Sequence, residues 1–201
     1  MNSRGIALAA VACAAGPVRF SFGEIVFRAW IDAPQAAVAG STFGASVWVQ
    51  ALGSSIDSDA NALASFTTDV LASGLVAELS EAELLIPGFS VGTPDGGALR
   101  EVSGFNHPAI APFSAANPLE LFTINVTLVS SATGTLVLDL NQTQGWEFMF
   151  SWWLDYDVGT YAFDTDPGST RIVTPALVRV VPEPASIGLL ACAALAARRR
   201  R

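Results

Sequence analysis

Apolar and polar residues alternate along much of the chain between residues 24 and 180. In TFGASVWVQA, residues 42–51, nearly every second residue is apolar, and the pattern returns in LELFTINVTLV, residues 119–129, and in TLVLDL, residues 135–140. Successive side chains of a β-strand point to opposite faces, so this period of two predicts strands with one buried face. The side chains expected on the buried faces are Phe43, Ala45, Val47, Val49 and Ala51; Phe122, Ile124, Val126 and Leu128; and Leu136, Leu138 and Leu140.

Turn-forming residues separate these runs. They cluster at Gly53-Ser54-Ser55, Pro87-Gly88, Pro94-Asp95-Gly96-Gly97, Asn117-Pro118 and Asp166-Pro167-Gly168. Short strands joined by such turns are typical of an antiparallel β-sandwich, so we expect one all-β domain over residues 24–180. Residues 61–71 and 75–85 are rich in Ala and Leu, and they fit a helix as well as a strand followed by a short helix or loop.

The first 15 residues, MNSRGIALAAVACAA, have the pattern of a secretory signal peptide. Arg4 precedes a short apolar core, and small residues suited to a signal peptidase follow it. We therefore expect residues 1–15 to be removed during export.

The last 21 residues, VPEPASIGLLACAALAARRRR, combine three features. A Pro-Glu-Pro element precedes the apolar run Ile187–Ala197, and four arginines end the chain. With the preceding Ala185 and Ser186, the run has 13 residues, and a helix of this length would span only about 20 Å, which is shorter than the roughly 30 Å hydrocarbon core of a bilayer. The arginines would hold this end on the cytoplasmic side of a membrane.

This arrangement over residues 181–201 resembles the PEP-CTERM sorting signal of exported bacterial proteins. The resemblance implies that an exosortase of the inner membrane recognises Pro182, Glu183 and Pro184. It also implies that the C-terminal helix contacts the membrane only transiently, and that the stop-transfer cluster is Arg198, Arg199, Arg200 and Arg201. Members of the family are exported by bacteria that make exopolysaccharide, which is a candidate partner.

The charge of the segment between the two tails restricts the classes of partner. Between residues 20 and 181, 17 acidic residues face four arginines, so this segment carries a net charge of −13. Such a body repels nucleic acids and anionic membranes, and we expect no nucleic-acid partner. Both cysteines, Cys13 and Cys192, lie in the terminal segments, so the body has no disulfide and no cysteine-based metal site.

The order of the expected strands also resembles the cohesin-like, jelly-roll β-sandwich of exported bacterial proteins. The matching elements over residues 25–140 are Gly40 before the strand Phe43–Ala51, a middle strand at Leu63–Leu71 and the strand pair at residues 117–140. The middle strand ends in Thr68-Asp69-Val70-Leu71, similar to an aspartate-containing strand end in such modules.

The aromatic segment GWEFMFSWWLDYDVGTYAF holds the candidate ligand-binding residues. On one strand, Trp146, Phe148, Phe150 and Trp152 would share a face, and we expect the first three to be core residues. Trp153 and Tyr156 are flanked by acids, so they are the candidates for an exposed surface that stacks on sugars.

Signals for metals and catalysis are weak. Asp57-Ser58-Asp59-Ala60-Asn61 copies half of a calcium loop, but Ala62 replaces its glycine and Thr68 its glutamate, so calcium stays open and no other cofactor is expected. The one histidine, His107, lies in a Pro-rich stretch without a nucleophile motif.

The sequence thus favours a non-catalytic exported protein with a structural or adhesive role in the cell envelope or exopolysaccharide matrix. The alternative is a carbohydrate-binding module that uses residues 146–161. A carboxylate-pair glycoside hydrolase ranks behind both.

Overall fold

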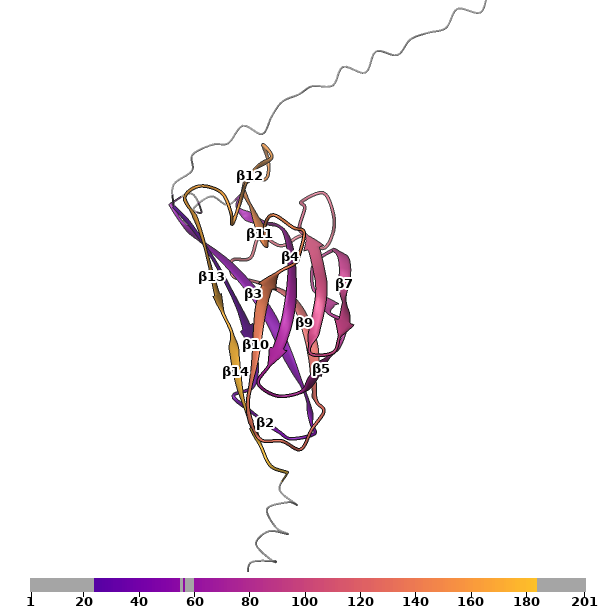
Figure 1. Cartoon of the computed structure of the whole chain (residues 1–201). Helices are drawn as coiled ribbons and strands as arrows, with labels where there is room; N and C mark the ends of the chain where they lie inside the picture. Colours follow the sequence, from indigo (N-terminus) through magenta and orange to yellow (C-terminus); the bar gives the residue numbers. More distant parts are fainter. Residues whose placement is uncertain (1–23, 55, 57–59, 184–201) are drawn as a thin grey trace, which may run out of the picture.

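The computed structural model describes residues 24–54, 56 and 60–183 as two β-sheets packed face to face (Figure 1). The predicted two-layer all-β sandwich is therefore confirmed. In this described part, the smaller sheet has the strand order β13-β1-β3-β9-β5, with β6 also paired to β9. Its strands are β1 (Ile25–Asp32), β3 (Thr42–Gly53), β5 (Ala77–Leu79), β6 (Glu83–Leu84), β9 (Leu119–Leu128) and β13 (Ser169–Thr174).

The larger sheet has the order β12-β11-β4-β10-β14-β2, with β8 paired to β4 and β7 paired to β8. Its strands are β2 (Ala36–Val38), β4 (Ala62–Ser73), β7 (Gly88–Asp95), β8 (Ala98–Phe105), β10 (Gly134–Gln142), β11 (Phe150–Asp155), β12 (Thr160–Phe163) and β14 (Ala176–Val181). Strand β8 follows one edge of β4, while β10 and β11 share the other edge end to end. Strand β4 is therefore the central strand of this sheet.

The core lies between the sheets, on the faces that the alternation predicts. The predicted faces of β3, β9 and β10 are buried, with the exception of Phe43, which is half-buried. Phe66 of the larger sheet stacks on Phe122 of the smaller one, with ring centroids 5.7 Å apart. The largest fully buried side chains include Trp152, Phe27, Phe66, Phe122 and Phe150. Burial of these apolar side chains is the main force that holds the two layers together.

The segments that fitted helix or strand equally well are strands. Residues 61–71 form most of β4, residues 75–85 contribute β5 and β6, and no helix occurs among the described residues. Strand β4 is buried along almost its whole length because neighbouring strands or side chains cover both of its faces. Because both faces are buried, polar residues such as Thr67, Thr68 and Asp69 are buried beside the apolar ones, and β4 shows no alternation of apolar and polar residues.

The prediction of purely antiparallel sheets is wrong at two places. Strand β13 runs parallel to β1, and β14 runs parallel to β2. Residues 169–181 therefore pass from the smaller sheet to the larger one. In each sheet they pair with a strand from the start of the domain, β1 or β2. Parallel neighbours need long connections, and here most of the domain lies between the paired strands.

The two ends of the described chain lie at opposite ends of the sandwich (Figure 1). The amide of Ile25 donates to the carbonyl of Gly168 at 3.2 Å, whereas the amide of Ala39 donates to the carbonyl of Val181 at 2.9 Å. The predicted signal segment 1–15, residues 57–59 of the half calcium loop, and Pro184 with the rest of the tail, including Arg198–Arg201, lie outside the described residues. Within the described ranges, no helix is long and apolar enough to cross a membrane.

Candidate functional site

A contiguous cluster of aromatic rings covers the outer face of β11 and β12 and the loop before β11. Its neighbouring ring centroids are 6.1, 4.5, 5.2, 5.5 and 5.8 Å apart along the series Trp146, Phe148, Phe163, Tyr161, Trp153 and His107. On β11, Phe150 and Trp152 point to the opposite face from Trp153 and are fully buried. The cluster therefore lies on the face of the larger sheet that points away from the core, and we call it the aromatic cluster.

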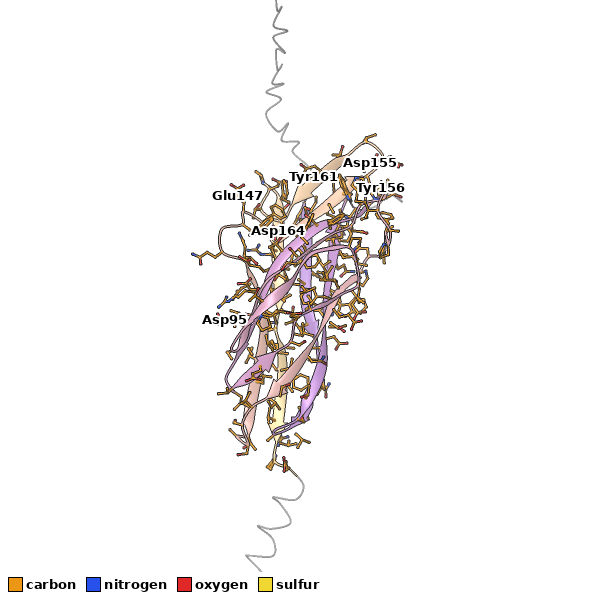
Figure 2. All side chains as sticks on the ribbon, turned by 90° about the vertical axis from the view of Figure 1, so that its right-hand side faces the viewer. Asp95, Glu147, Asp155, Tyr156, Tyr161 and Asp164 are labelled. Atoms are coloured by element: carbon orange, nitrogen blue, oxygen red, sulfur yellow. The ribbon has the colours of Figure 1, made fainter. Side chains whose placement is uncertain are left out.

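Besides the exposed His107, two members of the aromatic cluster present much of their ring to solvent. Trp146 is 46% exposed and Tyr161 is 47% exposed, while Phe148, Trp153 and Phe163 are half-buried beneath and between them. Figure 2 shows Tyr161 at the end of the sandwich where Glu147 and Asp155 also lie. Half-buried rings thus support two exposed rings, which is an arrangement suited to contact with a ligand.

The sequence-predicted binding residues Trp153 and Tyr156 both lie at this end of the molecule. Trp153 is half-buried, and its indole Nε1 donates to the carbonyl of Asn106 at 3.0 Å. The ring of Tyr156 packs edge-on against Phe113, with centroids 5.3 Å apart. Each ring therefore also holds a neighbouring segment in place, and their role in ligand contact stays a prediction.

The expectation that Trp146 is a core residue is wrong, whereas Phe150 is in the core as expected. The strand begins only at Phe150, so Trp146 lies in the loop over residues 143–149 and Phe148 is half-buried. Gly145, with a φ of 89°, turns the chain just before Trp146. A glycine in this position is the feature of the sequence that could have indicated a loop here. Tyr161 was not singled out individually. It meets Trp153 because a tight connection at residues 156–159 joins β11 to β12.

The carboxylate of Asp69 is the first of two buried acidic groups under this loop. It accepts hydrogen bonds from Arg100 Nη1 at 2.9 Å, the amide of Glu101 at 2.9 Å and Thr143 Oγ1 at 2.8 Å. Burial alone would raise the pKa of Asp69, but these donors together hold the pKa below its ordinary value. The charged carboxylate therefore links β4 to β8 and to the start of the 143–149 loop.

The carboxylate of Asp164 is the second buried group. Its side chain is fully buried, pairs with Arg171 Nη1 at 2.8 Å and accepts the amide of Met149 at 3.2 Å. Arg171 Nη1 also donates to Gln142 Oε1 at 3.1 Å. Burial raises the pKa of Asp164 above its ordinary value, although Arg171 and the backbone donors favour the charged form.

Together the two carboxylates fix the loop that carries Trp146. Thr143 at its start is bound to Asp69, and Met149 at its end is bound to Asp164. Between them, the side-chain amide of Gln142 donates to the carbonyl of Trp146. The exposed indole is thus held in position before any partner arrives, which lowers the entropic cost of binding.

We expect Asp69→Asn to change how stability depends on pH. Because the folded-state pKa of Asp69 is lowered, its charge stabilises the fold above its ordinary pKa, and this contribution is lost as the pH falls through the folded-state value. The difference in unfolding free energy between the natural protein and Asp69→Asn should therefore shrink from neutral pH to about pH 2.

Urea unfolding at a series of pH values measures this difference, with Asp164→Asn as the comparison. The folded-state pKa of Asp164 is raised, so the unfolding free energy lost in Asp164→Asn should grow on acidification. A difference that is independent of pH in both variants would contradict these assignments.

Of the half calcium loop at residues 57–61, the structure describes only Ala60 and Asn61. The side-chain amide of Asn61 donates to the carbonyl of Leu154, and Asn61 is 7% exposed. In the part of the chain that the structure describes, no group of three His, Cys, Asp or Glu side chains is arranged to hold a metal ion.

The fold is similar to those of solved cohesins. The sixth cohesin of scaffoldin B from Acetivibrio cellulolyticus, solved with a Cel5 dockerin, matches with a TM-score of 0.50 and 13% identity over 77% of this chain and 99% of that chain. A type II cohesin from the cellulosome of the same organism gives a TM-score of 0.48 and 9% identity over 76% and 95% of the two chains.

No protein-family model matches the sequence, and no curated protein matches it. At 13% identity, the likeness to the scaffoldin cohesin concerns the fold alone, and it agrees with the resemblance noted in the order of strands. The described residues form a cohesin-like β-sandwich.

Proposed function

We propose that this chain is an exported, non-catalytic binding protein of the cell envelope or exopolysaccharide matrix, and that it binds its partner through the aromatic cluster. One observation carries the proposal. Trp146, nearly half exposed, lies on a loop that two buried carboxylates fix at both ends, and Tyr161 on β12, exposed to the same degree, belongs to the same series of ring contacts. An exposed tryptophan held this firmly fits recognition better than packing.

The tail supplies the sorting part of the proposal. Strand β14 ends at Val181, and Pro182 and Glu183 follow it directly on the surface. The exposure of Pro182 and Glu183 supports the proposal that an exosortase recognises the Pro-Glu-Pro element directly after the last strand. A body anchored there would present its aromatic cluster at the end remote from the inner membrane (Figure 1).

The state of the buried acids supports a binding role over catalysis. Asp69 and Asp164 each accept hydrogen bonds from an arginine and from further donors. A glycosidase acid or base must instead face the substrate with a free oxygen. A hydrolase would therefore have to use surface carboxylates, and screening the protein against polysaccharides tests that alternative.

A protein partner is the second candidate. The cohesin with a TM-score of 0.50 was solved with a dockerin, and β7 of the outer β7–β8 pair exposes apolar side chains here. Phe89 is 74% exposed and its ring centroid lies 4.6 Å from that of Phe105, and Val91 on the same strand is 42% exposed. A dockerin is therefore one of the probes in the experiment that tests binding to the aromatic cluster.

Mass spectrometry of the native protein from cells with and without exosortase activity tests the proposed sorting. We expect a species from the envelope or medium that lacks residues 1–15 and the arginine cluster, and a longer, membrane-associated form when exosortase is absent. Recovery of the full-length polypeptide as a soluble cytosolic protein in both strains would refute export and sorting together.

A further inference from the structure

The exposed rings of the aromatic cluster are suited to the flat faces of sugar rings. Trp146 and Tyr161 offer apolar faces of the size of a pyranose, and the Tyr161 hydroxyl adds a hydrogen-bonding group. They belong to one series of ring contacts that also includes Phe148 and Phe163. A polymer with repeating rings can therefore engage more than one member of the series.

Acidic side chains surround these rings. Glu147 is exposed and directly follows Trp146. Asp155 lies opposite Thr160 in the register of β11 and β12, at the end of this strand pair, and Asp157 is exposed in the connection between the two strands. Figure 2 shows Glu147 and Asp155 on either side of Tyr161. The surface around the exposed rings therefore carries negative charge.

The arginines among the described residues do not offset this charge. Arg171 is paired with Asp164, and Arg100 lies 2.9 Å from Asp69 and 4.0 Å from Asp95. Arg28 lies on β1 of the smaller sheet, and Arg179 lies on β14 near the other end of the molecule. The histidine of the cluster, His107, is at the opposite end of the ring series from Trp146.

This combination selects among polysaccharides by charge. Uronate-containing or sulfated chains would meet the acids without a cation to bind them, so repulsion disfavours them. A sugar that carries a protonated amine gains attraction to Glu147 and Asp155, and also a cation–π contact with the indole. We propose that the aromatic cluster binds a cationic amino-sugar polysaccharide, in which pyranose units carry free amino groups. This inference deepens the proposed binding function and rests on it.

Binding of defined oligosaccharides to the full-length protein tests the inference. The probes are a glucosamine hexamer, its N-acetylated form, an oligouronate and the Cel5 dockerin, in weakly acidic buffer in which the amines carry protons. We expect the glucosamine hexamer to bind at least about fivefold more tightly than the acetylated form, equivalent to roughly 1 kcal/mol. The preference should fade at 1 M salt, where the screening length falls to about 3 Å.

Variants locate the site and its charge. Trp146→Ala and Tyr161→Ala should each weaken glucosamine binding about fivefold or more. Glu147→Gln should remove much of the preference for free amines while leaving binding of the acetylated hexamer unchanged. Leu177→Ala is the control, because Leu177 is a 63% exposed apolar residue on β14, outside the cluster, and it should bind as the natural protein does. Thermal unfolding confirms that each variant is folded.

Three outcomes would overturn the inference. The first is equal binding of the two hexamers, insensitive to salt and to Glu147→Gln. The second is an unaltered affinity in Trp146→Ala and Tyr161→Ala. The third is binding of the dockerin, lost in Trp146→Ala, without binding of any glycan. Failure of export in cells would refute the proposed sorting while leaving these binding measurements intact, so the two failures are distinguishable.

Discussion

Replacing Asp164 with alanine is expected to lower the free energy of unfolding by about 3–5 kcal/mol, because it removes one partner of a buried ion pair. The side chain of Asp164 is fully buried, whereas that of Arg171 is 28% exposed. The substitution also leaves the amide of Met149 without its acceptor, so the loop that carries Trp146 should loosen at one end. Chemical denaturation measures the first effect, and hydrogen exchange of residues 143–149 measures the second.

Asp95→Ala is the matched control for this prediction. Asp95 also lies near an arginine, but the distance is 4.0 Å and its side chain is 75% exposed. Exposed pairs contribute about 0–1 kcal/mol, so this variant should unfold nearly as the natural protein does. If Asp164→Ala and Asp95→Ala lost the same small amount, the pair with Arg171 would not be an important structural link.

Replacing Trp152 with alanine is expected to cost about 3–5 kcal/mol, because it opens a large cavity between the sheets. Trp152 is fully buried on β11, and its indole Nε1 has no hydrogen-bond partner among the described residues. Trp152→Phe leaves less empty volume and removes that unpaired donor, so it should cost clearly less than Trp152→Ala. Denaturant unfolding of both variants measures these differences.

Trp146, on the outer surface of the same region, provides the control for position. Trp146 is 46% exposed, so Trp146→Ala should change the unfolding free energy by at most about 1 kcal/mol. A larger loss in Trp146→Ala than in Trp152→Ala would mean that the inner and outer faces of this region are assigned the wrong way round.

The alternation of apolar residues was enough to predict the strands with one solvated face. It gave the buried faces of β3, β9 and β10 almost residue by residue. It could not decide β4, because a strand buried on both faces has no alternation to detect. It also placed Trp146 in the core, because a run of aromatic residues continues from the loop into β11 without a change of pattern.

The candidate site depends on contacts between distant parts of the chain, which the sequence pattern does not reveal. Asp69 was visible as an acid near the end of a strand, but its partners Arg100 and Thr143 lie 31 and 74 residues away. Two other acidic residues, by contrast, accept hydrogen bonds from nearby backbone amides. Asp166 accepts the amide of Phe163 at 2.8 Å, and Asp155 accepts the amide of Asp157 at 2.9 Å.

The position of the last strand has a mechanical consequence. Strand β14 lies between β10 and β2, and it is hydrogen-bonded along its length until the chain leaves the sheet at Pro182. Tension applied at Glu183 against a load held at the far end would run along this strand. Its hydrogen bonds would then resist as a group in shear and would not be peeled apart one after another. The sandwich is therefore built to carry a pulling force from one end to the other.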